Sequence, residues 1–146
     1  GGIDTAVVTL HVGPGTFLPI RDGELANYTM EAERYRVPAD TVARIERTHR
    51  RGRRVIAVGT TTVRTLESAA MRGCLEPGEG DADLFIRPGH AFRVVDGLLT
   101  NFHLPMTPLL ALVAAFASWD RLRVAYETAV ASRYRFYSYG DAMLIV

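Results

Sequence analysis

Residues 54–70, RVIAVGTTTVRTLESAA, predict a strand, a tight turn and a helix around which the rest of the chain is organised. Residues 55–58 are a short apolar, β-branched run, which is typical of a strand buried on both faces. Gly59 ends this run, and three candidate N-cap residues follow it: Thr60, Thr61 and Thr62. Apolar residues then recur at helical spacing: Val63, Leu66, Ala69 and Ala70.

The turn at Gly59 is a candidate site for a carboxylate or a phosphate. A helix N-terminus offers free backbone amides and the positive end of the helix dipole, and open α/β sheets bind ligands at the carboxyl ends of their strands. Arg64 and Glu67 lie one turn apart on another face of the predicted helix. A plain helix cap without a ligand is the alternative interpretation, and the residues alone leave both open.

Composition predicts a soluble, globular, cytoplasmic protein. Of the 146 residues 48% are hydrophobic and 23% charged, the net charge is +1, and all basic residues are arginines. The single Cys74 excludes an internal disulfide framework and suits a reducing cytosol. The apolar run 109–117 is far shorter than the ~20 residues that span a bilayer, so we expect no membrane partner.

Strand and helix signals alternate along the chain. Strands are expected at 6–12 and 84–86, and an Asp-Gly hairpin at 92–100. Residues 16–30 and 73–83 are expected to form loops, and 134–146 is rich in aromatic residues before a β-like end. A helix is expected from Pro38 to a C-cap at Gly52, with Val42, Ile45 and His49 facing inward. Two further helices are expected, one over residues 109–117 and one that starts at Trp119 or Asp120.

This alternation predicts an α/β sheet with at least two crossover helices and a hairpin at one side. A strand that starts at residue 6 and a β-like end at residue 146 suggest that residues 1–146 are cut from a longer chain.

The first predicted helix also carries a dense group of basic residues. Four of them are predicted to share one helical face: Arg44, Arg47, Arg51 and Arg54. Such a stripe can follow a phosphate backbone. A solvated helix end, where arginines favour the C-terminal dipole, explains it equally well.

Several common sites are excluded by the residue types. The four histidines have no zinc spacing, and without lysine there is no Walker motif. Gly13-Pro14-Gly15 lacks the third glycine of a dinucleotide fingerprint. Four polar turns of a kind that small-molecule sites use remain: HVGPGTF, GTTTVRTLES, TNFHLP and YSYGDAM.

In the order in which they occur, these turns resemble a known family. HVGPGTFLPI, RVIAVGTTTVRTLESAA, FRVVDGLLTNFHLP and YRFYSYGDAMLI are similar, with matching spacing, to the C-terminal half of the S-adenosylmethionine:tRNA ribosyltransferase-isomerase family of the queuosine pathway. The resemblance implies that the N-terminal half, with the rest of the α/β domain and a β-barrel domain, lies outside this chain.

The resemblance also implies an activity. The family uses S-adenosylmethionine as a ribosyl donor toward a 7-aminomethyl-7-deazaguanine in the tRNA anticodon. The ribosyl group rearranges to an epoxycyclopentanediol, giving epoxyqueuosine, while adenine and methionine leave. The sulfonium makes the neighbouring 5′ carbon acidic, so the protein must supply a base, a donor for adenine and a dry pocket. No metal is implied.

Roles for individual residues follow only from this resemblance. Asn101, His103 and Asp141 are expected to be catalytic, the first two as acid/base candidates. Arg64 and Glu67 are expected to clamp charged groups of the donor, although an internal salt bridge is the alternative. The other expected donor-binding residues are Gly13, Gly15, Thr16, Thr60, Thr61, Thr62 and an adenine- or sulfonium-facing Tyr137 or Tyr139. The arginine stripe is expected to contact tRNA.

One segment departs from the family pattern. Where the family commonly shows His-x-Met-His-x-Glu, this chain has Tyr28-Thr29-Met30-Glu31-Ala32-Glu33, so both histidines are replaced. Two alternative hypotheses therefore remain. The protein is a noncatalytic relative that binds S-adenosylmethionine or RNA, or it is an enzyme that acts on a small 7-deazapurine. For the enzyme, the turns at Thr60–Thr62, 101–103 and 139–141 should meet in one cleft.

Overall fold

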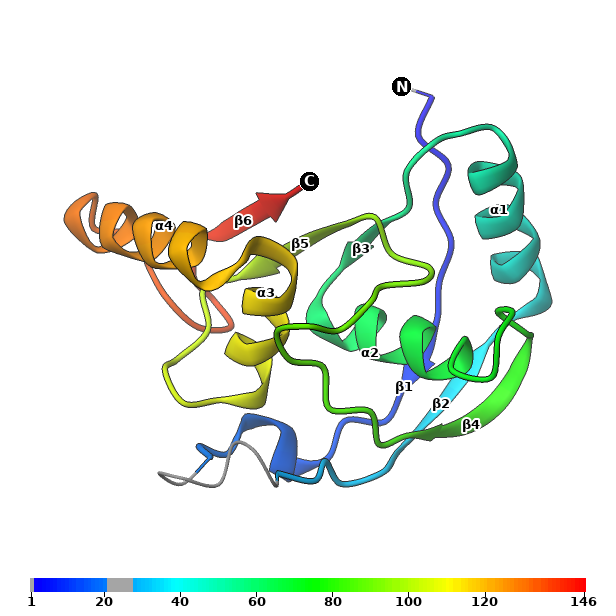
Figure 1. Cartoon of the computed structure of the whole chain (residues 1–146), viewed down its shortest axis with the longest axis horizontal. Helices are drawn as coiled ribbons and strands as arrows, with labels where there is room; N and C mark the ends of the chain where they lie inside the picture. The colour runs from blue at the N-terminus through cyan, green and yellow to red at the C-terminus, as the bar shows by residue number, and fades with distance from the viewer. Residues whose placement is uncertain (1, 21–27) are drawn as a thin grey trace.

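Helix α2 (Thr60–Ala69) packs against two three-stranded sheets in the computed structural model, which describes residues 2–20 and 28–146 (Figure 1). The first sheet is antiparallel and has the order β1 (Thr9–Leu10), β2 (Glu33–Val37) and β4 (Gly78–Ala82). The second has the order β3 (Ile56–Val58), β5 (Gly97–Asn101) and β6 (Ala142–Ile145), with β3 parallel and β6 antiparallel to β5. The predicted α/β class and the strand–turn–helix of 54–70 are confirmed.

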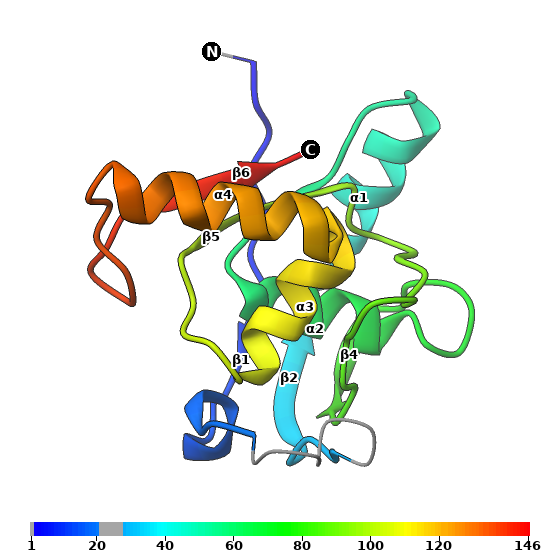
Figure 2. The same ribbon diagram turned by 60° about the vertical axis from the view of Figure 1, so that its left-hand side comes forward.

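Three further α-helices lie in the described part of the chain. Helix α1 (Ala39–Arg50) follows β2, whereas α3 (Pro108–Ala117) and α4 (Trp119–Ala131) lie over one face of β5 and β6, as both ribbon views show (Figures 1 and 2). Thr107 caps α3 by accepting a hydrogen bond from the Leu110 amide at 3.3 Å, and Pro108 begins the helix as predicted. A short 3₁₀ helix (Pro14–Phe17) follows β1.

The core lies between α2, the two sheets and α3. Val63 and Leu66 of α2 are buried in one cluster with Leu98 of β5 and with Leu112 and Val113 of α3. Burying such side chains contributes about 1.5–3 kcal/mol each. The helical spacing of apolar residues in α2 is therefore explained by packing on several sides.

The hairpin predicted at 92–100 is wrong. β5 begins at Gly97, and residues 92–95 form an irregular segment. Three of their four amides already donate to the Glu67 carboxylate, those of Arg93, Val94 and Val95. The Asp96 carboxylate accepts from the Val55 amide at 2.8 Å, so the Asp-Gly pair fixes the entry to β3 and β5 instead of turning a hairpin.

Other predicted elements differ in extent. A strand, β4, occupies part of the predicted acidic loop 73–83, whereas residues 84–86 are not a strand. The five-residue β4 pairs with β2 along its whole length, which offsets its glycine-rich composition. β1 has only two residues of the predicted 6–12. The predicted loop 16–30 includes residues 21–27, which lie outside the described residues.

The strand β3 is buried on one face only, contrary to the prediction. Ala57 is buried, but the side chain of Val58 is 68% exposed. Its neighbours in register across the sheet, Leu99 and Leu144, are exposed as well. Because side chains alternate along a strand, these three residues form an apolar row on the sheet face opposite the core.

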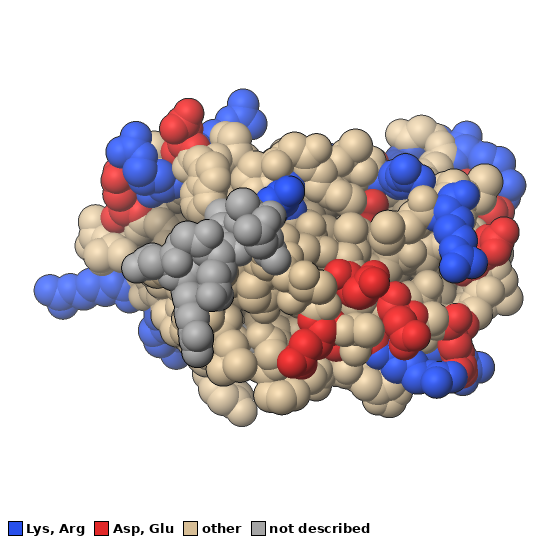
Figure 3. Space-filling view, turned by 60° about the horizontal axis from the view of Figure 1, so that its bottom comes forward, with Lys and Arg blue, Asp and Glu red and all other residues tan. Residues whose placement is uncertain are grey.

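Within the described residues, no helix is long and apolar enough to cross a membrane. Nor do three or more His, Cys, Asp or Glu side chains gather there as metal ligands. The face in Figure 3 is largely uncharged, with acidic side chains gathered across its middle and basic ones toward its ends.

Candidate functional site

A cavity of about 210 Å³ opens where β3 and β5 end. Because the two strands are parallel, the residues that follow them meet at the same edge of the sheet. The lining comes from three places in the sequence: Gly59, Thr60 and Thr61 after β3; Thr100, Asn101, His103 and Leu104 at the end of β5; and Thr107 and Leu109 at the start of α3. Tyr137 and Ser138 complete it.

The start of α2 at the cavity differs from the prediction in its cap. Gly59 is the N-cap, with φ of 86°, and no threonine side chain caps the helix. This left-handed conformation favours glycine and leads the chain from β3 directly into the helix. The Thr62 hydroxyl donates to the Val58 carbonyl at 2.7 Å and does not line the cavity. Thr60 and Thr61 do.

His103 is held in the cavity wall as a neutral imidazole. Burial lowers its pKa to about 4, because the charged form loses its hydration. Its Nε2 shares a hydrogen bond of 2.9 Å with the hydroxyl of Thr100, which is itself buried. Near neutral pH the ring therefore carries one donor and one acceptor nitrogen and can exchange a proton with a ligand.

The loop before β6 closes over the end of β5. The Asn101 side-chain amide donates to the carbonyls of Gly140 and Asp141 at 3.3 and 3.2 Å. The Tyr137 amide donates to the Phe102 carbonyl at 3.0 Å. Tyr137 has φ of 73°, a strained value for a non-glycine residue, so the surrounding contacts determine its conformation.

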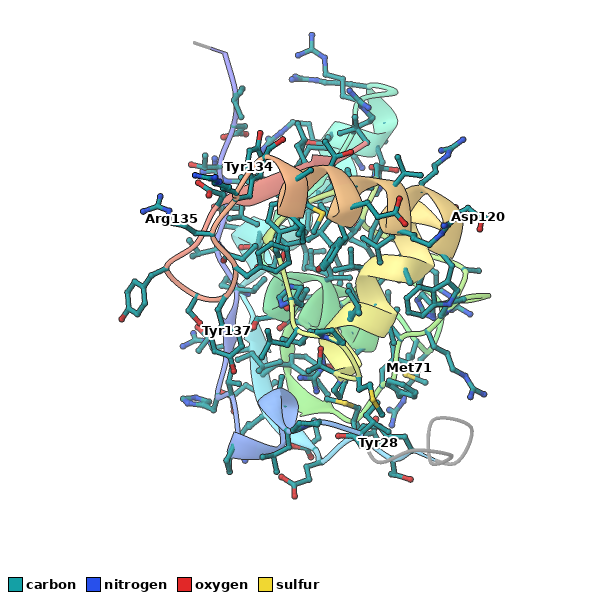
Figure 4. The ribbon with its side chains drawn as sticks, turned by 90° about the vertical axis from the view of Figure 1, so that its left-hand side faces the viewer. Tyr28, Met71, Asp120, Tyr134, Arg135 and Tyr137 are labelled. Carbon is teal, nitrogen blue, oxygen red and sulfur yellow. The ribbon has the colours of Figure 1, made fainter. Side chains whose placement is uncertain are left out.

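Two predicted residues of this loop do not line the cavity. Tyr139 is 98% exposed. The Asp141 carboxylate accepts from the Arg135 amide at 2.7 Å and pairs with its guanidinium, and these bonds lower the pKa of Asp141. In Figure 4, Tyr134 and Arg135 lie at the upper left of the view, Tyr137 lies below them, and Tyr28 lies near the bottom.

Arg64 is buried away from the cavity. Its side chain, 3% exposed, forms an ion pair with the buried Glu33, bonds to Thr16 at 3.1 Å and donates to the Ala82 carbonyl at 3.0 Å. The structure therefore gives Arg64 partners within the chain rather than a place in the cavity wall.

Glu67 has a second set of internal partners. Its carboxylate, 1% exposed, accepts from three consecutive backbone amides, those of residues 93–95, at 2.9–3.1 Å. His90 Nε2 lies 3.6 Å away. The alternative of an internal salt bridge between Glu67 and Arg64 does not form, because the two side chains point to different parts of the fold.

Glu33, the partner of Arg64, also forms hydrogen bonds to the segment that contains Gly13-Pro14-Gly15. The Gly13 amide donates to Glu33 Oε1 at 2.7 Å, and the Thr16 hydroxyl donates to the same oxygen. At Gly15 the backbone approaches the Glu31 carboxylate, because a Cβ atom there would lie 2.8 Å from its Oε2 and the exposed Glu31 side chain would have to move. These three predicted donor-binding residues therefore do not line the cavity.

The segment that departs from the family pattern lies beside this turn. Met30 and Glu33, which fit the pattern, are buried, and Tyr28 stacks edge-on against Phe85 with ring centroids 5.1 Å apart. Burial and the nearby Glu31 carboxylate raise the pKa of Tyr28. The two replacements are thus adjacent to the Glu33–Arg64 pair and not among the cavity residues.

The predicted arginine stripe is broken in two ways. Helix α1 ends at Arg50, with Gly52 at φ of 62° after it, so Arg51 is the C-cap and Arg54 lies beyond the helix. Arg44 forms ion pairs with Asp40 and Asp4. Within the described part of the chain, Arg47, Arg51, Arg53 and Arg54 are exposed and form no ion pair. His49, expected to face inward, is exposed and contacts Asp96 at 3.1 Å.

Sequence reasoning missed several cavity residues. Thr100 and Thr107 were not singled out, although Thr107 stands directly before Pro108, a position where a helix cap is expected. Leu104, Leu109 and Ser138 carry no comparable signal. The turns at Thr60–Thr61 and 101–103 do meet in one cavity as predicted. The third turn was predicted wrongly, because none of residues 139–141 lines the cavity and the preceding Tyr137 and Ser138 do.

The cavity lining has no charged side chain among the described residues and consists of hydroxyls, an amide, a neutral imidazole and apolar groups. The first turns of α2 and α3 both border it, so two helix N-termini face the same space. Fold and cavity together indicate an α/β domain with a candidate small-molecule site at the carboxyl ends of parallel strands.

Comparison with known proteins agrees with an α/β domain and identifies the protein family. The family model described as "Queuosine biosynthesis protein" matches residues 1–145. The chain is 56% identical to the S-adenosylmethionine:tRNA ribosyltransferase-isomerase of Thiobacillus denitrificans and 58% identical to that of Azoarcus sp., covering 99% of this chain and 42% of each relative. The chain therefore belongs to the queuosine biosynthesis protein family and spans about two fifths of the length of these relatives.

A solved structure gives the same result. The crystal structure of S-adenosylmethionine tRNA ribosyltransferase from Thermotoga maritima matches with a TM-score of 0.76 and 48% sequence identity. The match covers 97% of this chain and 44% of that one. The fold described here is therefore one part of a longer family fold.

Proposed function

We propose that the protein containing this chain transfers the ribosyl group of S-adenosylmethionine to a 7-aminomethyl-7-deazaguanine in the tRNA anticodon and isomerises it to epoxyqueuosine, with release of adenine and methionine. The observation that carries the proposal is the meeting of two family motifs, GTTTVRTLES and TNFHLP, with the loop before β6 in one cavity. Family membership supports the reaction class, and the polar lining of the cavity supports a donor bound there.

The chemistry of the lining suits a sulfonium donor. The donor supplies an acidic 5′ carbon and two leaving groups. No cationic side chain borders the cavity among the described residues, so a sulfonium is not repelled there, and the Tyr137 ring can face it. The hydroxyls of Thr60 and Thr61, next to the α2 N-terminus, suit the methionine carboxylate or ribose hydroxyls.

Asn101 and His103 are the acid/base candidates in this proposal. A neutral imidazole can accept a proton at one nitrogen, and burial keeps His103 neutral throughout the physiological range. The Asn101 amide donates to two carbonyls of the closing loop, which leaves its oxygen for a ligand. The Asp141 carboxylate, by contrast, accepts a hydrogen bond from the Arg135 amide within the loop.

The remainder of the protein completes the site. A cavity of about 210 Å³ is smaller than the roughly 300–1,000 Å³ of typical ligand sites, so further walls are needed. The apolar row Val58–Leu99–Leu144 is a surface for such a segment, because exposed rows of this kind are normally covered. We expect residues 1–146 alone to be inactive.

The acceptor base is part of a tRNA, so the protein must also bind the tRNA backbone. The exposed arginines at the end of α1 (Arg47, Arg51, Arg53 and Arg54) can contact phosphates, since no acidic side chain among the described residues neutralises them. Arg44 is left out of this surface because Asp4 and Asp40 hold it.

Mass spectrometry tests the proposal. Full-length protein is incubated with S-adenosylmethionine and tRNA carrying the aminomethyl-deazaguanine. The masses of the released small molecules and of the tRNA are then measured. Release of adenine and methionine in equal amounts, with a matching gain in tRNA mass, is expected. Donor binding without any release contradicts the proposal and favours a noncatalytic relative.

A different acceptor is the second candidate, because Tyr28 and Glu31 stand where the family commonly has histidines. The experiment restores both histidines (Tyr28→His with Glu31→His) and compares activity on modified tRNA and on the free 7-deazapurine. If the replacements changed the acceptor, the double variant gains tRNA activity while its affinity for the donor is unchanged. Equal kinetics for both proteins would show that these positions do not select the acceptor.

A further inference from the structure

Tyr126, in the middle of α4, makes two hydrogen bonds to the backbone of His103. The His103 amide donates to the phenol oxygen at 2.8 Å, and the phenol donates to the His103 carbonyl at 3.1 Å. A phenol has one hydrogen to donate and lone pairs to accept, so both bonds can form together. One side chain thus satisfies both backbone groups of a residue in the cavity wall.

The ring of Tyr126 is itself fixed. It packs edge-on against Phe102, with centroids 5.3 Å apart, and against Phe136 at 5.6 Å. Burial raises the pKa of Tyr126, so the phenol keeps the proton that it donates. The hydroxyl is therefore held at a defined place relative to α4.

The imidazole of His103 is held at a separate point. Its Nε2 bonds to Thr100, in the ladder of β5, and this leaves Nδ1 as the polar ring atom without a partner among the described residues. Because His103 lies beyond the last residue of β5, no strand pairing fixes its backbone. The Tyr126 hydroxyl takes the place of that pairing.

We propose that Tyr126 is a positioning residue for the reaction, whose hydroxyl places the His103 imidazole against the ligand in the cavity. The kinetic part of this inference rests on the proposed function. Reacting groups must be held to within about 0.5 Å, and a misplacement of about 1 Å can cost roughly a hundredfold in rate. Losing the hydroxyl should therefore reduce turnover without removing a group that touches the donor.

The chain offers a matched pair of variants. Tyr126→Phe removes the hydroxyl and keeps the aromatic packing. Tyr134→Phe is the control, because Tyr134 also packs against Phe102, at 5.8 Å, and its hydroxyl makes no hydrogen bond to the described residues. In full-length protein we expect Tyr126→Phe to lower kcat at least tenfold with KM for S-adenosylmethionine within about twofold, and Tyr134→Phe to change neither.

A double-mutant cycle separates positioning from a general effect on folding. If Tyr126 acts through His103, adding Tyr126→Phe to a His103→Ala protein lowers kcat no further. Independent, multiplicative losses in the double variant would overturn the inference, as would an unchanged kcat in Tyr126→Phe alone.

Nuclear magnetic resonance tests the inference even if turnover is absent. Among the described residues, the titratable groups that contact His103 or share its cavity are the phenol of Tyr126, which is bonded to the His103 backbone, and the phenol of Tyr137. In the wild type the His103 ring, identified by its loss in His103→Gln, should not titrate between pH 8 and 5.5. In Tyr126→Phe its pKa should rise toward the ordinary value of about 6.5 as water reaches it. An unchanged titration in Tyr126→Phe contradicts the inference, whereas a changed titration in a protein without turnover contradicts only the proposed function.

Discussion

The first turn of α2 and the middle of the same helix use polar residues in opposite ways. Thr60 and Thr61 border the cavity and carry no charge. Arg64 and Glu67, about one and two turns further along α2, are charged and buried, and the hydrogen-bond partners found for them lie within the chain. Within one motif, therefore, Thr60 and Thr61 border the cavity, whereas the two charged residues connect parts of the fold.

This difference follows from the cost of burying charge. A buried ion is costly unless it is paired and hydrogen-bonded. Both Nη atoms of Arg64 meet this condition, whereas its buried Nε has no hydrogen-bond partner among the described residues. Arg64 connects α2 to β2 and β4 through Glu33 and the Ala82 carbonyl, and Glu67 connects α2 to the segment before β5. The two charges fix α2 between the sheets, and its first turn is thereby fixed at the cavity.

The largest effect on stability is expected from Arg64→Met. The substitution leaves the Glu33 carboxylate buried without its cation, which should lower the free energy of unfolding by about 3–5 kcal/mol. Denaturant unfolding of the full-length protein measures it, with Arg47→Met as an exposed control expected to change stability by less than about 0.5 kcal/mol. A loss below about 1 kcal/mol for Arg64→Met would assign Arg64 to a ligand instead of to the fold.

Glu67→Gln should have a smaller effect. The amide oxygen of glutamine can still accept from Val94 and Val95, but the new NH₂ group faces the Arg93 amide, so one donor loses its partner. We expect a loss of about 1–3 kcal/mol in the same unfolding assay. Normal stability combined with weakened donor binding would move Glu67 from the fold to the site.

The cavity predicts a pH effect of known sign. The pKa of His103 is about 4 in the folded chain and about 6.5 when unfolded, so the unfolded state binds more protons between these values. Stability should therefore fall as pH is lowered from 6.5 toward 4, and His103→Gln should remove part of that fall. Unfolding curves at pH 7, 5.5 and 4.5 measure the difference, and parallel curves for the two proteins would show that His103 does not contribute.

The smallest effect on stability is expected at the end of α1. Replacing Arg47 and Arg51 by Ala should change the free energy of unfolding by less than about 0.5 kcal/mol each, because both side chains are exposed. Each lost phosphate contact should reduce the slope of log affinity for tRNA against log salt by roughly one. An unaltered slope in a normally folded double variant would show that tRNA binds elsewhere.

Much of the fold could be predicted from local patterns. Residues 55–70 combine a β-branched run, a glycine and helical spacing, and each of these signals agrees with the observed β3 and α2. Pro108 and Gly52 mark helix ends through their own backbone preferences. The hairpin at Asp96-Gly97 was wrong because distant side chains, Glu67 above all, take the amides that a hairpin needs.

The site was less predictable for the same reason. Which strands end side by side depends on pairing between β3 and β5, and only the folded chain brings Thr61 near His103. Sequence motifs identified the turns, but not which of their polar residues face inward. Asp141 and Tyr139 stand in a motif that reaches the cavity, and yet their side chains serve the loop or solvent.

Binding of the donor at the first turn of α2 can be measured directly with threonine methyl groups. Full-length protein labelled at threonine methyls is titrated with S-adenosylmethionine and observed by nuclear magnetic resonance. Large shifts are expected at the four cavity residues (Thr60, Thr61, Thr100 and Thr107), with little change at Thr16, which is bonded to Glu33 and Arg64, or at Thr41, which is bonded to the Val7 carbonyl. Shifts centred on Thr16, with the cavity methyls unmoved, would contradict the account and place the donor beside the buried charges.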